Sequence, residues 1–317
     1  MKLDKNKFLD RTITTREVIF LLAFVLCLSP FITPPIALLM GIIIAQFIGH
    51  PYLHLNHKAT HILLQISVVG LGFGMNINSA LEAGREGFIL TVASILGTLG
   101  LGFLMGFLLK IDQKISYLIS TGTAICGGSA IAAVSPVIKA NEKQISVALG
   151  IIFILNSIAL FIFPVLGHYL HLTDKQFGIW CAIAIHDTSS VVGASAKFSE
   201  KALEIATTIK LARALWIIPV AFFSTLLFKS KEAKIKIPYF IGLFVLAMVA
   251  NTYSKFVQDY SYILTTIAKS GLTLTLFLIG CGLSRKVLSA VGVKPLVQGI
   301  VLWVVISLVS LWAVRIL

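Results

Sequence analysis

Long apolar runs, separated by short polar turns, follow one another along nearly the whole chain. Runs such as 18–28 and 36–44 contain no charged residue. About 20 mostly apolar residues are enough to cross a bilayer as an α-helix. The pattern predicts eleven spans, at residues 18–33, 34–50, 61–77, 87–109, 115–137, 144–166, 176–196, 205–228, 237–254, 261–281 and 295–315. We therefore expect an all-α polytopic membrane protein.

The polar connections between these spans are too short to hold a soluble domain. The longest of them, residues 229–236, is a lysine-rich loop of the kind found next to membranes. We expect a cytoplasmic N-terminal segment, 1–17, followed by a single transmembrane domain, 18–317. The surrounding partner of that domain is the lipid bilayer.

Composition and charge agree with this pattern. The 317 residues are 57% hydrophobic and 12% charged, whereas soluble domains carry about 25% charged residues. The net charge of +13 reflects topology, because positive residues gather in cytoplasmic loops. With a cytoplasmic N-terminus, 16 Lys and Arg fall in inside loops and 7 outside. A soluble enzyme and a nucleic-acid-binding protein are excluded on these grounds.

The motifs of common enzymes are missing from the sequence. The four cysteines form no CxxC pair, and the sequence contains no P-loop, HExxH or GxSxG pattern. We therefore expect no enzymatic activity, no cofactor and no metal site.

Two of the expected spans carry a polar break at their centre. The first break contains Gly127 and Gly128 followed by Ser129 and Ala130, and the second covers 185–195. Paired glycines let a helix unwind, and a following serine can cap a new half-helix. The N-terminus of such a half-helix suits an anion. Close helix packing through small residues is the alternative explanation.

The two breaks also resemble each other. Three positions recur at a constant offset of 60 residues: Ile125, Ser129 and Ser135 match Ile185, Ser189 and Ser195. Secondary transporters build midplane binding sites from discontinuous helices, so a duplicated break favours a transporter. If both segments crossed the membrane fully they would run parallel, so an inverted repeat is left open.

Asp187 is the carboxylate expected deepest in a span, with His186 before it and Thr188, Ser189 and Ser190 after it. A charge at membrane depth is costly and usually functional. Asp187 could bind a cation, carry a proton or cap the next half-helix, and His186 could titrate with it. We assign these two residues to ion coupling.

Three basic residues also fall within spans. Lys269 lies at the middle of its span, where we expect it to pair with Asp187 or to hold an anionic substrate. Lys210 and Arg213 open their span, so we expect them to extend to the outer interface or, alternatively, to steer an anion into a cavity.

Three sequence blocks resemble the YeiH-like bacterial membrane proteins, a family named for sulfate export. The blocks are LQISVVGLGFGMN at 64–76, ICGGSAIAA at 125–133 and IHDTSSVVGA at 185–194. The resemblance implies a bacterial inner-membrane protein of ten or eleven spans. It also implies broken, crossed helices like those of the cation/proton antiporter and bile acid transporter superfamily.

The expected function is secondary export of a small anion, such as sulfate, sulfite or a sulfonate, coupled to a proton or cation. The expected substrate-binding residues are Gly127, Gly128, Ser129, Ala130, Thr188, Ser189, Ser190 and Lys269. A proton or sodium antiporter using Asp187, and a scaffold or sensor without transport, are the alternatives. Analogy with such transporters also leads us to expect a homodimer.

Overall fold

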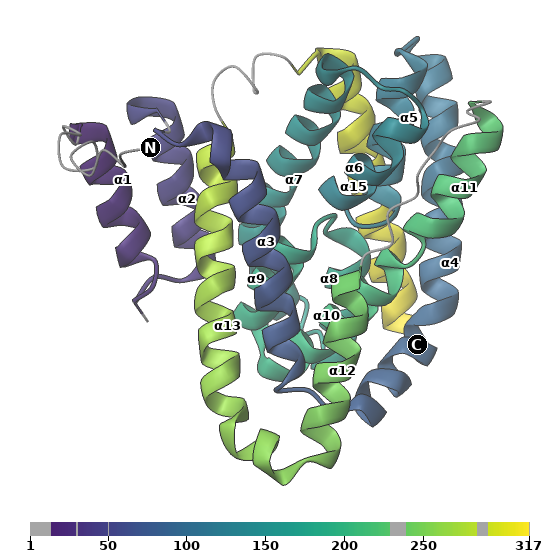
Figure 1. The fold of residues 1–317 in the computed structure, drawn as a ribbon. Coiled ribbons are helices and arrows are strands. Elements are labelled where there is room, and N and C mark those ends of the chain that lie inside the picture. Colours follow the sequence, from purple (N-terminus) through teal and green to yellow (C-terminus); the bar gives the residue numbers. More distant parts are fainter. Residues whose placement is uncertain (1–13, 30, 50, 229–238, 284–290, 317) are drawn as a thin grey trace, which may run out of the picture.

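The computed structural model describes residues 14–29, 31–49, 51–228, 239–283 and 291–316, and most of the predicted segment 1–17 lies outside them. All regular elements in these residues are helices (Figure 1). They are α1 (Thr15–Leu26), α2 (Pro34–Ile43) with its continuation η2 (Ile44–Ile48), α3 (Leu53–Gly72), α4 (Ile77–Leu108), α5 (Gln113–Ala124), α6 (Gly128–Val137), α7 (Glu142–Tyr169), α8 (Asp174–Ala184), α9 (Thr188–Phe198), α10 (Glu200–Ala214), α11 (Ile217–Leu227), α12 (Tyr239–Tyr253), α13 (Lys255–Gly282) and α15 (Val293–Ile316).

Several of these helices are suited to a bilayer. Among the described residues, five stretches are long and apolar enough to cross a membrane: Gly87–Leu108, Glu142–Tyr169, Glu200–Leu227, Lys255–Gly282 and Val293–Ile316. Pro34–Ile48, Gly128–Val137 and Tyr239–Tyr253 are shorter apolar helices. The chain is thus a multi-pass membrane protein, as its hydropathy predicted.

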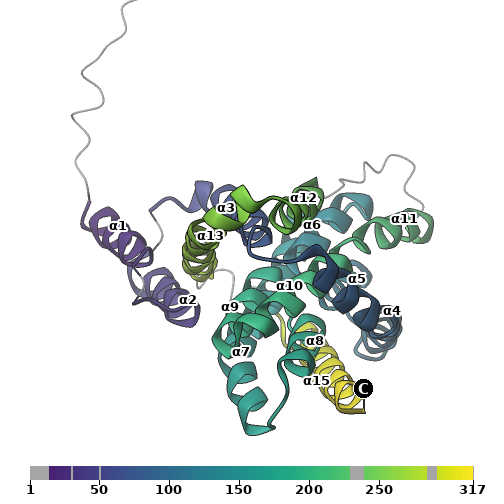
Figure 2. The same cartoon turned by 90° about the horizontal axis from the view of Figure 1, so that it is seen from below.

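The helices form two bundles (Figure 2). In the first, which we call the α13 bundle, α13 packs against α2 and α3, and α12 packs against α3. Its α2–α13 contact is close, because a Cβ added to Gly41 would lie 2.1 Å from the Phe277 carbonyl oxygen. The second bundle, the hairpin bundle, contains α4 to α11 and α15, with fewer contacts to the first.

The hairpin bundle contains two pairs of half-helices. In each pair, the start of the first half-helix lies beside the end of the second. At the start of α5, Lys114 Nζ donates to the Lys139 carbonyl, which follows α6, at 2.7 Å. At the start of α8, Asp174 Oδ1 accepts from the Ser199 hydroxyl, which follows α9, at 2.6 Å. The pairs α5–α6 and α8–α9 are therefore hairpins, which we call hairpin 1 and hairpin 2.

The two hairpins enter from opposite sides. Helix α7 connects them and has 28 residues, or about 42 Å at 1.5 Å per residue. Gln144 in its first turn bonds to Asp112 beside the start of α5, at 3.0 Å. Helix α7 thus runs from the rim of hairpin 1, the first rim, to the rim of hairpin 2, the second rim. Entry from opposite sides relates the hairpins by inverted topology.

The sequence left open whether the segments 115–137 and 176–196 cross the membrane fully or re-enter, and this arrangement favours re-entry. Each segment is long enough to span the bilayer, but the chain turns back at the polar break instead of continuing. The count of eleven spans is consequently not confirmed. Hydropathy scores a hairpin of two apolar half-helices and a single crossing helix alike, which is why the pattern suggested full crossings.

Candidate functional site

The tips of the two hairpins meet. Residues Ile125 to Gly127 separate α5 from α6, and Ile185 to Asp187 separate α8 from α9. Gly127 has a φ of +65°, which favours glycine, and a Cβ added there would lie 3.2 Å from the Asp187 Cβ. The structure therefore brings the two predicted breaks together at one crossing point.

Asp187 caps helix α9. Its Oδ1 accepts hydrogen bonds from the Ser190 amide at 2.6 Å and the Ser189 hydroxyl at 2.9 Å. Its Oδ2 accepts from Asn156 Nδ2 at 2.5 Å and the Ser190 hydroxyl at 3.2 Å. The capping role is thus confirmed, while ion coupling stays a prediction. Each serine hydroxyl has one proton to donate, and both are given to the carboxylate.

Asn156 joins this cap to the rest of the break, and the sequence analysis missed it. It lies in the middle of α7, and its Oδ1 accepts from the His186 amide at 3.0 Å while its Nδ2 reaches Asp187. One amide side chain thereby fixes two consecutive residues of the unwound segment. The signal was present in the sequence, since a lone asparagine in the apolar span 144–166 needs a polar partner.

The His186 ring is separate from this network. It is fully buried, and neither ring nitrogen has a hydrogen-bond partner among the described residues. Thr188 is also buried, and it opens helix α9 beside the cap. The structure thus places both residues at the break without giving either side chain a polar contact at Asp187.

Two buried cations from α10 bind the C-terminal ends of the first half-helices, α8 and α5. Lys210 Nζ donates to the carbonyls of Ile185 at 2.6 Å and Ala182 at 3.2 Å, at the end of α8. Arg213 donates to the carbonyl of Ala124, the last residue of α5, at 2.5 Å. Helix C-termini carry partial negative charge, so a cation at each is favourable.

The expected placement of Lys210 and Arg213 at the outer interface is therefore wrong. Both side chains are 0% exposed. They lie near the middle of the 28-residue stretch Glu200–Leu227, because this crossing begins at Glu200, earlier than hydropathy suggested. Burial without carbonyl partners would be costly for either charge, so their hydrogen bonds explain their position.

The N-terminus of α6 differs from that of α9. Its N-cap is Gly127, which provides no side-chain hydrogen bond, and Gly128 and Ser129 are partly exposed while Ala130 is buried. The Cys126 thiol approaches Ser129 and the Ala130 amide, but a thiol is only a weak acceptor. This helix end therefore presents amide donors and a hydroxyl with no carboxylate of its own.

Comparison with known proteins places the chain in a family. The family model described as conserved hypothetical protein 698 matches residues 15–299. The chain belongs to this family. Similar relatives, all named UPF0324 membrane protein, include one from Bacteroides thetaiotaomicron, 58% identical over 89% of this chain and 86% of the relative. One from Porphyromonas gingivalis is 50% identical over 89% of this chain and 87% of the relative. One from Photobacterium profundum is 49% identical over 96% of this chain and 94% of the relative.

The names of these UPF0324 relatives state a membrane protein and no substrate. The sulfate-export name of the sequence resemblance is therefore not shown for this chain. No solved structure gives a significant match.

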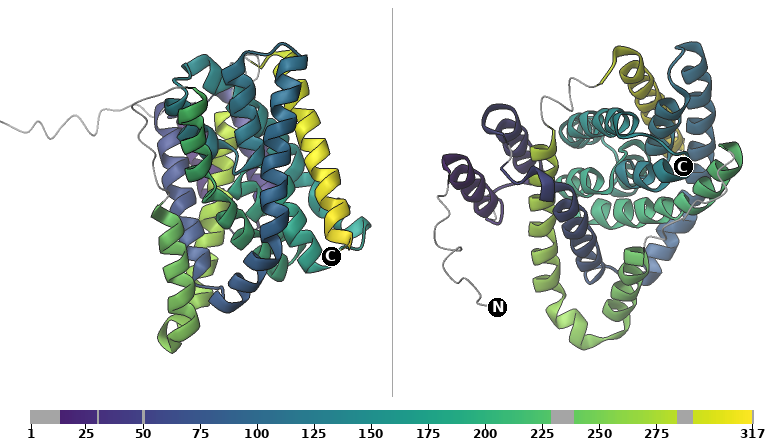
Figure 3. Two further views of the ribbon diagram at one scale, coloured as in Figure 1. Left: turned by 90° about the vertical axis from the view of Figure 1, so that its right-hand side faces the viewer. Right: turned by 45° about the horizontal axis from the view of Figure 1, so that its top comes forward.

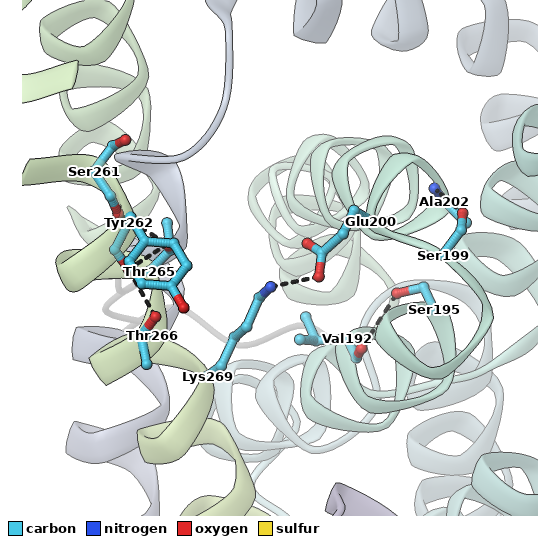
Figure 4. A network of polar contacts seen from close by, with 10 residues as sticks. All are labelled: Val192, Ser195, Ser199, Glu200, Ala202, Ser261, Tyr262, Thr265, Thr266 and Lys269. Atoms are coloured by element: carbon cyan, nitrogen blue, oxygen red, sulfur yellow. Dashed lines mark hydrogen bonds and ion pairs between the residues drawn. The ribbon is translucent and has the colours of Figure 1, made fainter. Parts of the chain in front are cut away.

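Lys269 of this UPF0324 chain lies outside the crossing network. Its Nζ pairs with Glu200 Oε1 at 2.6 Å, and the two side chains are 40% and 76% exposed (Figure 4). The predicted pairing with Asp187 is thus wrong. The sequence offered no means of choosing Glu200, which lies 69 residues away at the start of α10. The ion pair instead connects the α13 bundle to the second rim.

The described residues contain no group of three or more His, Cys, Asp or Glu side chains able to hold a metal ion. The crossing is therefore a set of amides, hydroxyls, one carboxylate and two cations. Such a set can hold an anion or position a proton. It lies where α5–α6 and α8–α9 are interrupted.

Proposed function

We propose that the protein is a secondary transporter that binds a small anion at the N-terminus of α6. The observation that carries this proposal is the difference between the two half-helix ends at the crossing. The α9 end already holds an oxyanion, the Asp187 carboxylate. The α6 end has the same dipole but no side-chain cap from Gly127, and its nearest acceptor is the Cys126 thiol, a weak one. An anion there would accept hydrogen bonds from the first turn of α6, as Asp187 does from the first turn of α9.

The buried charges support an anionic ligand. Among residues with described side chains, the charged ones in the buried class are Asp187, Lys210 and Arg213. Their formal sum is +1, and an interior of low dielectric constant favours a compensating negative charge. A monovalent anion beside Asp187 would balance the two cations, and a divalent one would require an accompanying proton or cation.

The donors at the α6 end support a substrate with anionic oxygens. Amides at Gly128 and Ser129 suit the oxygens of sulfate, sulfite or a sulfonate. The Ala130 amide and the Ser129 hydroxyl would exchange the weakly accepting Cys126 thiol for the same oxygens. The family resemblance points to the same class. Asp187 and His186 are our candidates for carrying the coupling proton or cation, and movement of one bundle against the other would change the side to which the site opens.

The hairpins support the predicted orientation in a bacterial inner membrane, with the N-terminus in the cytoplasm. With both hairpins turning back, Lys139 and Lys143 move to the first rim, the predicted inside, and Lys175 moves to the second rim, the predicted outside. Reassigning these three residues changes the division of Lys and Arg predicted from the sequence from 16 inside and 7 outside to 17 inside and 6 outside. The stronger bias supports a cytoplasmic N-terminus.

Reconstitution into proteoliposomes tests the proposal. Uptake of radiolabelled sulfate, sulfite and taurine is measured with and without a pH gradient, in wild type and Ser129→Ala. Anion flux that depends on Ser129 supports the proposal. A cation-dependent pH change without anion flux would establish the antiporter alternative. The absence of both fluxes in correctly folded protein would favour a scaffold or sensor without transport.

A further inference from the structure

A cavity of about 530 Å³ lies between α4, α5 and α11, away from the hairpin crossing. Its walls are mainly apolar and include Leu99, Phe103, Phe107, Tyr117, Leu227 and Phe228. The volume falls within the range of roughly 300–1,000 Å³ that is usual for small-molecule sites. No interaction of the transport proposal uses this cavity.

The cavity faces the lipid. Phe103 is 73% exposed, Phe107 75% and Leu227 57%, so both flanking helices turn large apolar side chains outward at its edge. In a multi-pass protein this surface meets acyl chains. Helices α4, α5 and α11 all supply lining residues, and Figure 2 shows α5 next to both α4 and α11.

One end of the cavity reaches the first rim, at the α4–α5 turn. Ile111 and Gln113 line this end, and exposed Lys110 precedes them in the α4–α5 turn. The nearby Asp112 is already engaged, since its Oδ1 accepts from the Lys114 and Ile115 amides and from Gln144 Nε2. Asp112 keeps its negative charge, which Lys114 offsets, and Lys110 is the exposed cation next to the apolar opening.

Helix α5 is held by its own polar contacts and does not close the cavity. The Tyr117 hydroxyl and the Ser224 hydroxyl form a 2.8 Å hydrogen bond between α5 and α11. Gln298 Nε2 of α15 donates to the Ser116 hydroxyl at 2.7 Å from behind. These bonds fix α5 while the space between α4 and α11 stays open to an apolar occupant.

We propose that this cavity binds an anionic phospholipid. One acyl chain lies between α4 and α11 against the aromatic walls, and the headgroup phosphate meets Lys110 at the first rim. An apolar slot with a cation at the interface matches that chemistry, whereas a zwitterionic headgroup gains less from that cation. The lipid packs on α5, so it supports hairpin 1 from outside.

The test is lipid-dependent stability of the full-length protein in detergent. Phosphatidylglycerol and phosphatidylcholine of identical chains are added, and the thermal midpoint and retained lipid are measured by fluorescence and native mass spectrometry. We expect phosphatidylglycerol to raise the midpoint by several degrees more than phosphatidylcholine. Lys110→Gln should remove that difference, whereas Lys255→Gln, an exposed lysine at the other end of the molecule, should keep it.

A second variant tests the acyl chain separately. Leu99→Trp places a larger side chain into the cavity and should abolish retention of both lipids while the protein keeps its elution volume. Equal stabilisation by the two lipids, or an undiminished phosphatidylglycerol effect in Lys110→Gln, would overturn the headgroup assignment. Full lipid retention in Leu99→Trp, or no retained lipid in wild type, would overturn the cavity as the site.

Discussion

The two hairpins are alike in how their first half-helices end and differ in how their second half-helices begin. In both, the first half-helix ends on a buried cation from α10: Arg213 at α5 and Lys210 at α8. The second half-helix of hairpin 2 then begins on Asp187, which accepts four hydrogen bonds. That of hairpin 1 begins on Gly127 with no side-chain cap. The chain supplies the anion for one helix end and leaves the other to a ligand.

Removing the carboxylate from hairpin 2 should have the largest effect. Asp187→Ala leaves the Asn156 amide and two serine hydroxyls without their acceptor inside the protein. Loss of one partner from a buried charged network costs about 3–5 kcal/mol. We expect this loss of stability in chemical unfolding, with Asp187→Asn much milder because asparagine also caps helices. An alanine variant as stable as wild type would show that the carboxylate is not what completes α9.

The next comparison removes the cations one at a time. Lys210→Met removes the hydrogen bonds to the carbonyls at the end of α8, and Arg213→Met removes the hydrogen bond to the Ala124 carbonyl at the end of α5. We expect about 1–3 kcal/mol of destabilisation for each, from the unsatisfied acceptors. The measurement is the unfolding midpoint of both variants beside Lys197→Met, whose lysine is exposed on α9. A loss in one variant only would break the equivalence of the hairpins.

A carboxylate can also be given to hairpin 1. Ser129→Asp places a negative charge in the first turn of α6, where a carboxylate is favourable by about 0.3–1 kcal/mol. We expect slightly higher stability together with loss of anion flux, because the new side chain takes the place of the ligand. Ser157→Asp, on the adjoining helix α7, controls for charge alone. Unchanged anion flux in Ser129→Asp would remove α6 as the binding site.

The smallest effect on stability is expected at the rim of hairpin 2. Lys269→Met and Glu200→Gln each break an exposed ion pair, and such pairs contribute about 0–1 kcal/mol. Their double variant should match either single variant in unfolding. Since the pair joins the bundles, we expect transport rates to change more than stability. Unaltered transport in both single variants would show that the contact has no role in movement.

Sequence reasoning located the breaks closely. The offset of 60 residues reappears in the structure, since α5 and α8 end at Ala124 and Ala184 and α6 and α9 begin at Gly128 and Thr188. Glycine pairs and a lone aspartate in apolar surroundings are local signals, so they can be read without the fold. The family resemblance rested on the same blocks.

The partners of these breaks were beyond such reading. Whether a broken segment continues or turns back depends on contacts such as Lys114 with the Lys139 carbonyl. The same holds for Lys210, whose acceptors lie 25 and 28 residues earlier in the chain. Hydropathy marks such a lysine as unfavourable in a span and assigns it to an interface, although carbonyls from another helix satisfy it inside.

The Lys269–Glu200 contact also shows which level of α13 lies beside the second rim. Lys269 lies 14 residues after Lys255, the first residue of α13, which is about 21 Å along the helix. Glu200 marks the second rim, so the α12–α13 turn extends well beyond the hairpin bundle on that side (Figure 3). A bilayer core is about 30 Å thick, so it cannot be level with both bundles at once. A vertical slide of the hairpin bundle along α13 would level them, and it would carry the crossing toward the opposite membrane surface with both hairpins intact.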